Sequence, residues 1–203
     1  PVVVDMDFLQ TALSLNTETE AADPEQTLAL YSAWMELRTG DVGFVLDTLE
    51  AAKASQALGG AWYTDGNEDL LLSLLERTDV TRIGLMGHSM GGATAVALGR
   101  TRPDVTAVVD IDGTMLGEYL GVGADGEYLL NEAPYPLPVL EFVNWETYNG
   151  LAEYLAEGHS YPNDLLMKQA PQGFSTTLRD TKHMDFTDLP LLSPALSRLL
   201  GSA

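Results

Sequence analysis

Short apolar runs alternate with amphipathic segments along this chain, and the alternation predicts strands and helices in turn. Apolar residues recur at helical spacing from Asp41 to about Gly60 and again over 70–75. Further helices are expected after Pro24, over 93–98 and after Pro194. Strands are expected where compact apolar runs end in polar or glycine-rich turns, at 2–6, 81–86, 105–111, 137–143 and 174–179.

Strands that alternate with helices indicate a mostly parallel sheet flanked by helices. The stretch 116–132, rich in glycine and tyrosine, is expected to be irregular. No repeat or linker divides the chain, so we expect a single α/β domain over residues 1–203.

Composition narrows the class of partner. Thirty acidic residues against ten basic ones give a formal net charge of −20, which repels phosphate backbones and anionic membrane surfaces. Nucleic acid is therefore not expected as a partner. No apolar run approaches the ~20 residues that span a bilayer, so we expect a soluble protein, cytoplasmic or secreted, with no integral membrane segment. The chain has no cysteine, which excludes disulfides and a cysteine nucleophile.

The main chemical signal is Gly87-His88-Ser89-Met90-Gly91, which lies between a predicted strand and a predicted helix. A serine hydroxyl is a poor nucleophile unless it is exposed on a sharp turn, beside a base and beside donors for an oxyanion. Glycines two residues either side of the serine permit such a turn. The pattern predicts Ser89 as a nucleophile and the Met90 backbone N–H, at the helix start, as an oxyanion donor.

Two histidines can act as the base. His183 follows the last predicted strand, where this architecture brings its base over the serine, whereas no such strand precedes His159. His183 is therefore expected to be the base. His88, beside the nucleophile, is expected to be a packing residue that points away from it.

The orienting acid has two possible sources at strand ends. Asp110 and Asp112 close the strand after the elbow, and Glu146 follows the next strand. We expect at most one of Asp110 and Asp112 to reach the site. Asp112, followed by the permissive Gly113, is nearer the catalytic edge.

Four blocks resemble the platelet-activating-factor acetylhydrolase-like branch of the α/β-hydrolases. The blocks are GHSMGGAT at 87–94, IDGTM at 111–115, PVLEFVNWE at 138–146 and HMDFTD at 183–188. The resemblance runs from about Arg38 to Leu189. It implies a triad of Ser89, Asp112 and His183 and a calcium-independent hydrolase of carboxylic esters, often with short or lipid-like acyl groups. A hydrolase of this kind requires no cofactor.

Some positions depart from that family. Thr114 stands where the acid block of the family has tryptophan, and the following stretch differs in composition, so the acyl pocket can differ. The elbow also resembles that of cutinase-like polyesterases and lipases, whose acid lies one strand later. They rank second because this chain lacks their cysteine pair. A non-catalytic binding module of the same fold, which keeps the elbow as a turn, is the remaining alternative.

Two further patterns concern ligands. A pocket for an apolar ester is expected beside the triad, lined by Leu116, Tyr119, Trp145 and Tyr148. A calcium-loop spacing is formed by Asp65, Asn67, Asp69 and Glu76, but Leu70 stands where that loop requires glycine, so no metal site is expected.

One part of the hydrolase machinery has no counterpart in this sequence. In α/β-hydrolases a second oxyanion donor comes from a loop after the third strand, usually within a His-Gly motif, and the chain has no such dipeptide. Residues 2–6 look like the fourth strand of the fold. We therefore expect the fold to lack its N-terminal strands, and a missing N-terminal segment or second chain to complete the sheet.

Overall fold

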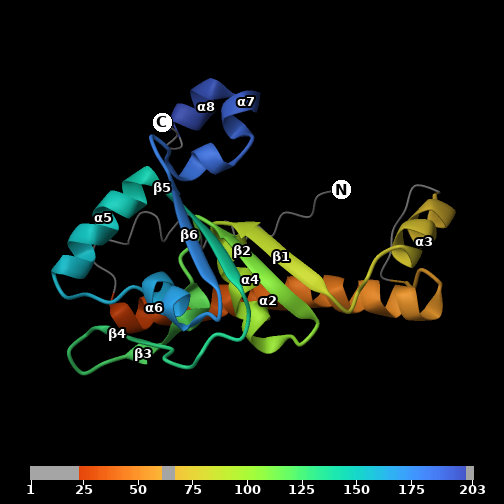
Figure 1. Cartoon of the computed structure of the whole chain (residues 1–203), viewed down its shortest axis with the longest axis horizontal. Coiled ribbons are helices and arrows are strands. Elements are labelled where there is room, and N and C mark those ends of the chain that lie inside the picture. Colours follow the sequence, from red (N-terminus) through yellow and green to blue (C-terminus); the bar gives the residue numbers. More distant parts are fainter. Residues whose placement is uncertain (1–22, 61–66, 200–203) are drawn as a thin grey trace.

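A four-stranded parallel sheet forms the centre of the computed structural model, which describes residues 23–60 and 67–199 (Figure 1). The strand order is β1-β2-β5-β6, with parallel pairing throughout. The strands are β1 (Ile83–His88), β2 (Val105–Ile111), β5 (Val139–Asn144) and β6 (Gly173–Leu178). The sequence predicted all four to within two residues at each end. The fifth predicted strand, at 2–6, lies outside the described residues.

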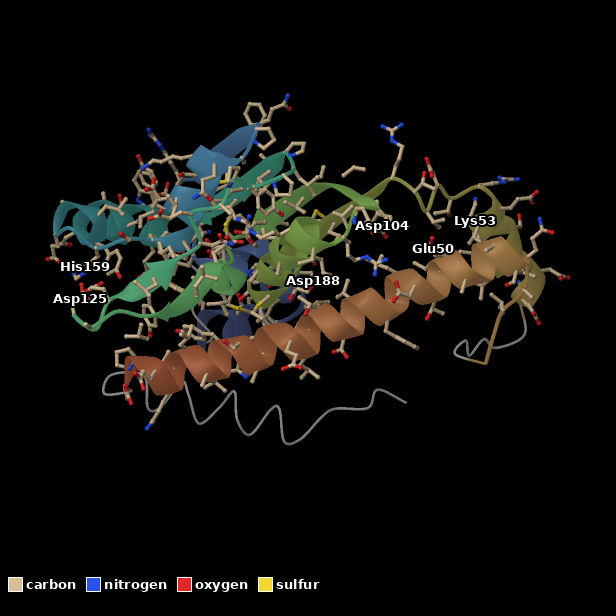
Figure 2. All side chains as sticks on the ribbon, turned by 90° about the horizontal axis from the view of Figure 1, so that it is seen from below. Glu50, Lys53, Asp104, Asp125, His159 and Asp188 are labelled. Carbon is tan, nitrogen blue, oxygen red and sulfur yellow. The ribbon has the colours of Figure 1, made fainter. Side chains whose placement is uncertain are left out.

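Helices cover one face of the sheet. The helix α4 (Met90–Thr101) packs on β1 and β2, and the long helix α2 (Pro24–Ser55) crosses its outer side. Figure 2 shows α2 running along one side of the molecule, with α4 between it and the sheet. The other helices are α3 (Glu68–Glu76), α5 (Trp145–Ala156), α6 (Pro162–Gln169), α7 (Leu189–Leu192) and α8 (Pro194–Leu199). No helix among the described residues is long and apolar enough to cross a membrane.

The helix α2 is continuous where the sequence predicted two segments. Asp23 caps its first turn by accepting a hydrogen bond from the Glu25 N–H, and Pro24 occupies the first helical position. Gly40, near its middle, lowers helix propensity by only about 1 kcal/mol, which is too little to break it. At the other end, Lys53 donates hydrogen bonds to carbonyls at the end of α3 (Figure 2).

The apolar core lies between α4 and the sheet. It is formed by fully buried residues of α4, β2, β5, α6 and the connecting loops: Val96, Val105, Val108, Met115, Tyr135, Val139 and Leu166. Leu85 of β1 packs against this core, whereas the next residue, Met86, is 70% exposed. Because successive strand residues face opposite sides, the second face of β1 is open within the described part of the chain.

The stretch 116–132 is more regular than predicted. It contains a short 3₁₀ helix, Leu116–Glu118, and an antiparallel hairpin of β3 (Tyr119–Val122) and β4 (Tyr128–Leu130). An Asp-Gly turn whose Gly126 has a φ of 85° connects the two strands. The prediction failed because each strand has only three or four residues, too few to show alternation.

The described residues thus have an α/β-hydrolase fold, a mostly parallel sheet flanked by helices, from the strand before the elbow onward. Parallel strands bring their carboxyl ends to one edge of the sheet. The turns that follow β1, β2, β5 and β6 therefore lie next to one another at that edge.

Candidate active site

Ser89 lies on a sharp turn between β1 and α4, as the sequence predicted for this position. Its backbone has φ 57° and ψ −126°, a strained conformation for a residue other than glycine. The Ser89 N–H donates to the Ile111 carbonyl at 2.8 Å, which ties the turn to the neighbouring strand. A Cβ on Gly87 would lie 2.2 Å from the Gly91 carbonyl carbon, so only glycine permits this close return of the chain.

Met90 is the first residue of α4. Its backbone N–H is one of the first-turn amides that have no acceptor within the helix, and the helix dipole makes this end partially positive. Ser89 and Met90 both line one cavity of about 760 Å³ at the carboxyl edge of the sheet. The serine hydroxyl and a potential oxyanion donor are therefore neighbours.

Asp112 occupies a second strained turn, directly after β2, with a φ of 56°. Its carboxylate accepts two bonds from Asn144 at the end of β5, from the backbone N–H at 2.8 Å and from Nδ2 at 2.6 Å. Only 2% of the side chain is exposed. Burial alone would raise the pKa of Asp112, but the hydrogen bonds from His183 and Asn144 outweigh burial and keep the pKa below its ordinary value. Asp112 is therefore a carboxylate near neutral pH.

His183 begins a short 3₁₀ helix, His183–Phe186, after β6. Its Nδ1 lies 2.7 Å from Asp112 Oδ2, so Nδ1–H donates to the carboxylate and Nε2 is the acceptor nitrogen of the neutral ring. The side chain is 42% exposed and lines the same cavity as Ser89. The Lys182 N–H donates to the Asp185 carboxylate at 2.8 Å, which fixes the loop that carries the ring.

His88 contacts the loop that carries His183. This contact was not predicted from the sequence. Its Nε2 donates to the His183 carbonyl at 3.0 Å, and the two imidazole rings lie 4.5 Å apart. Burial lowers the pKa of His88, and the neighbouring His183 lowers it further. His88 is thus a neutral ring that packs against His183 and also holds its backbone. The adjacency of His88 to the serine gave no indication of this bond.

The other candidate residues lie outside the serine–histidine–aspartate cluster. His159 lies beside the hairpin, 3.4 Å from Glu127 Oε1 and near Asp125 in Figure 2. Glu146 is exposed at the wall of the cavity, and Asn144 is the residue of that strand end that contacts Asp112. Asp65 of the possible calcium loop lies outside the described residues. Among the residues described, no three His, Asp or Glu side chains are grouped to hold a metal ion.

Two of the four predicted pocket residues, Leu116 and Tyr148, line the cavity. Tyr119 instead packs between Tyr31 and Tyr128, and Trp145 stacks on Tyr148 from outside the lining. The cavity wall includes further apolar residues that the sequence did not indicate: Trp34, Phe142, Leu151 and Met167. These come from α2, β5, α5 and α6, and only the fold brings such distant segments together.

The expectation that at most one of Asp110 and Asp112 reaches the site is wrong, because both line the cavity. The strand β2 continues regularly only to Ile111, and Asp112 follows on a turn with a φ of 56°, so strand alternation does not decide which side Asp112 faces. Asp110 is fully buried. Burial, together with the neighbouring Glu141, raises the pKa of Asp110 to about 8, so this carboxyl is protonated at neutral pH.

Known proteins that are similar to this chain include two esterases. A bis(hydroxyethyl) terephthalate hydrolase from Streptomyces coelicolor is 27% identical over 185 residues, covering 81% of this chain and 58% of the relative. A ferulic acid esterase from Streptomyces cinnamoneus, solved at 2.4 Å resolution, is 26% identical with a TM-score of 0.47 and covers 86% of this chain and 38% of the esterase. No protein-family model matches. The chain thus spans less than two thirds of the length of either protein.

Proposed function

We propose that this chain is the catalytic part of a serine hydrolase that cleaves carboxylic esters, with Ser89 as nucleophile, His183 as base and Asp112 as orienting acid. The observation that carries the proposal is the His183 Nδ1 to Asp112 Oδ2 contact of 2.7 Å in the cavity that Ser89 lines. Ser89 stands there on a strained turn at the end of its strand. The similarity to the bis(hydroxyethyl) terephthalate hydrolase supports ester hydrolysis in general terms.

The chemistry follows from the state of each group. Asp112 is ionised and accepts from Nδ1, so the neutral His183 ring can take the Ser89 proton at Nε2 as the hydroxyl oxygen attacks the ester carbonyl. The developing oxyanion accepts from the Met90 N–H at the positive end of α4. His183 then returns the proton to the departing alcohol. It next activates the water that releases the acid from the acyl-enzyme.

The pocket favours an ester with a compact apolar acyl or aryl group. Its apolar wall, formed by residues such as Trp34, Phe142 and Tyr148, lies beside the Ser89 turn. The resemblance to the acetylhydrolase-like branch favours short-chain or lipid-like acyl esters, with Asp112 as the acid after the strand that follows the elbow. The relative that hydrolyses bis(hydroxyethyl) terephthalate makes that small aryl diester a second substrate to assay.

Activity-based labelling tests the proposal. A fluorophosphonate probe should label the protein at Ser89, and Ser89→Ala should abolish both the label and hydrolysis of p-nitrophenyl butyrate. Ser197→Ala provides the control and should keep both the label and the activity, because Ser197 is buried in α8 and lies outside the cavity lining. Absence of labelling, or labelling that persists in Ser89→Ala, would favour the non-catalytic binding module.

We further propose that a segment or second chain outside the described residues pairs with β1 and supplies the second oxyanion donor. β1 is an edge strand of the described sheet, and Met86 on its open face is 70% exposed. Loss of one oxyanion donor lowers turnover on the order of 10²–10³-fold. Turnover by this chain should therefore rise by about that factor when a segment or chain that pairs with β1 is added. Equal rates would contradict this proposal.

A further inference from the structure

Three buried polar side chains lie beneath the acid turn and take no direct part in the proposed chemistry. Asp110 on β2 is fully buried, and Glu141 on β5 and Asn163 on α6 are each 5% exposed. Asp110 and Glu141 are partners in the parallel register, so their side chains stand side by side on one face of the sheet. We call these three residues the buried hub.

Asn163 connects the hub to the backbone that follows the acid. Its Oδ1 accepts from the Met115 N–H at 2.9 Å, and its Nδ2 donates to the Gly113 carbonyl at 2.7 Å. The same Nδ2 group donates to Glu141 Oε1 at 2.8 Å. One amide side chain thus fixes both ends of the loop that leaves Asp112.

Asp110 contacts both strained turns. Its Oδ1 accepts from the Gly113 N–H at 3.1 Å, directly after the acid. On the other side, a Cβ on Gly92 of the elbow helix would lie 1.8 Å from the same oxygen. The Asp110 carboxyl therefore fills the space between the first turn of α4 and the acid turn.

The groups around Asp110 favour the protonated form of its carboxyl group. Asp110 faces Glu141, Asp112 and the Tyr161 hydroxyl, and burial together with Glu141 keeps Asp110 protonated at neutral pH. Asn163 Nδ2 lies 3.5 Å from Asp110 Oδ2, a long contact that leaves this oxygen to hold the proton. A neutral Asp110 can therefore donate as well as accept.

We propose that the buried hub is a positioning group, which holds the acid turn against the nucleophile elbow so that Asp112 meets His183 in the cavity of Ser89. The inference rests on the proposed function, because the hub acts on the reaction only through Ser89, Asp112 and His183. It assigns a role to a protonated carboxyl that touches no reacting atom.

Kinetics of hub variants test this role. Asp110→Ala and Asn163→Ser should each lower kcat for p-nitrophenyl butyrate by about tenfold or more, with KM changed by less than about twofold, because positioning affects the reacting geometry rather than substrate binding. Asp110→Asn should keep kcat within a few-fold of wild type, since an amide has the shape and the donor of a protonated acid. If Asp110→Ala does not fold, the milder Asn163→Ser carries the test.

The matched control is Glu118→Gln. Glu118 is also buried, 2.7 Å from Arg100 in an ion pair, but it lies outside the hub and the cavity lining. This variant should lower the melting temperature and leave kcat unchanged. A purely structural hub would give Asp110→Ala the same behaviour as this control.

Proton NMR of the His183 Nδ1–H supplies a readout that does not depend on turnover. Its downfield resonance should shift or disappear in Asp110→Ala and Asn163→Ser and persist in Asp110→Asn and Glu118→Gln. Folded hub variants that keep both the resonance and kcat would overturn the inference. If the wild type neither labels with fluorophosphonate nor hydrolyses esters, the proposed function fails, and the resonance alone still decides whether the hub positions Asp112 against His183.

Discussion

The nucleophile elbow and the acid turn reach nearly the same positive φ by opposite means. Ser89 and Asp112 follow neighbouring parallel strands, with φ values of 57° and 56°. The elbow is held by close backbone packing that only glycines at 87 and 92 permit. The acid turn is held by side-chain hydrogen bonds from residues far away in the sequence, chiefly Asn144 and Asn163.

The comparison shows which interactions compensate the backbone strain at each of the two turns. At the elbow the compensation is local, since a few consecutive small residues both permit and stabilise the turn. At the acid turn it depends on the tertiary structure, since donors from β5 and α6 must arrive before Asp112 can keep its conformation. We expect the elbow to be sensitive to added volume and the acid turn to changes in hydrogen bonding and protonation.

The largest expected effects come from removing the key side chain of each turn. Ser89→Ala should lower kcat by ~10⁶-fold, whereas Asp112→Asn should lower it by ~10⁴-fold, because the latter keeps the nucleophile and the base but leaves the base poorly oriented. Steady-state rates with p-nitrophenyl butyrate measure both. Glu146→Gln is the control and should cost less than about tenfold. A large loss in Glu146→Gln with none in Asp112→Asn would assign the acid to the following strand instead.

The second effect concerns pH and separates the hub from the elbow. Folded protein holds the Asp110 proton up to about pH 8, whereas the unfolded chain releases it near pH ~4. Between these values the folded state binds more protons, so the free energy of unfolding should fall as pH rises, by up to ~1.4 kcal/mol per pH unit. Asp110→Asn should remove this contribution. Urea unfolding of wild type and Asp110→Asn at pH 5 and pH 8 measures it, and parallel pH profiles would contradict it.

The third effect tests the packing of the elbow. Gly92→Ala places a Cβ 1.8 Å from Asp110 Oδ1 and should lower the free energy of unfolding by ~1–3 kcal/mol. Gly91→Ala is the matched control, because no atom lies within 4 Å of its added Cβ. This neighbour should leave stability unchanged or raise it by up to ~1 kcal/mol through helix propensity. Thermal unfolding of the two variants measures the difference. Equal melting temperatures would show that the elbow tolerates an added methyl group at position 92.

The smallest expected effect comes from weakening the contact between His88 of the elbow and the loop that carries His183. His88→Phe keeps a ring against His183 but removes the donor to its carbonyl, a bond worth ~0.5–1.5 kcal/mol. We expect kcat/KM to fall by ~2–10-fold. His88→Gln can retain the donor and should lose less. A larger loss in the Gln variant would mean that ring packing, rather than the hydrogen bond, holds the loop.

Local patterns were enough to predict the strands and the elbow. The apolar runs gave the four described strands, and the Gly-x-Ser-x-Gly spacing indicated the Ser89 turn because that turn depends on consecutive residues. The continuity of α2 and the short β3–β4 hairpin were missed. In both cases the local signal was weak, and packing against α4 or between tyrosine rings decides the structure.

The acid turn shows what a sequence pattern does not carry. Asp112 was named from family resemblance, but its partner Asn144 and the hub residues come from separate strands and a helix. The burial and the protonation of Asp110 were not predicted from the sequence, because they depend on residues across the sheet such as Glu141. Likewise, Trp34 reaches the cavity from a helix more than fifty residues before the serine.

The bonds around Gly113 also bear on how the protein ages. An aspartate followed by glycine is a common place for spontaneous chain damage, in which the glycine nitrogen attacks the carboxyl group to form a cyclic imide. Here the Gly113 N–H is committed to Asp110, and the Asp112 carboxylate is held by Asn144 and His183. The geometry that orients the carboxylate toward the imidazole therefore also keeps it from its own backbone and slows isoaspartate formation at the residue on which the triad depends.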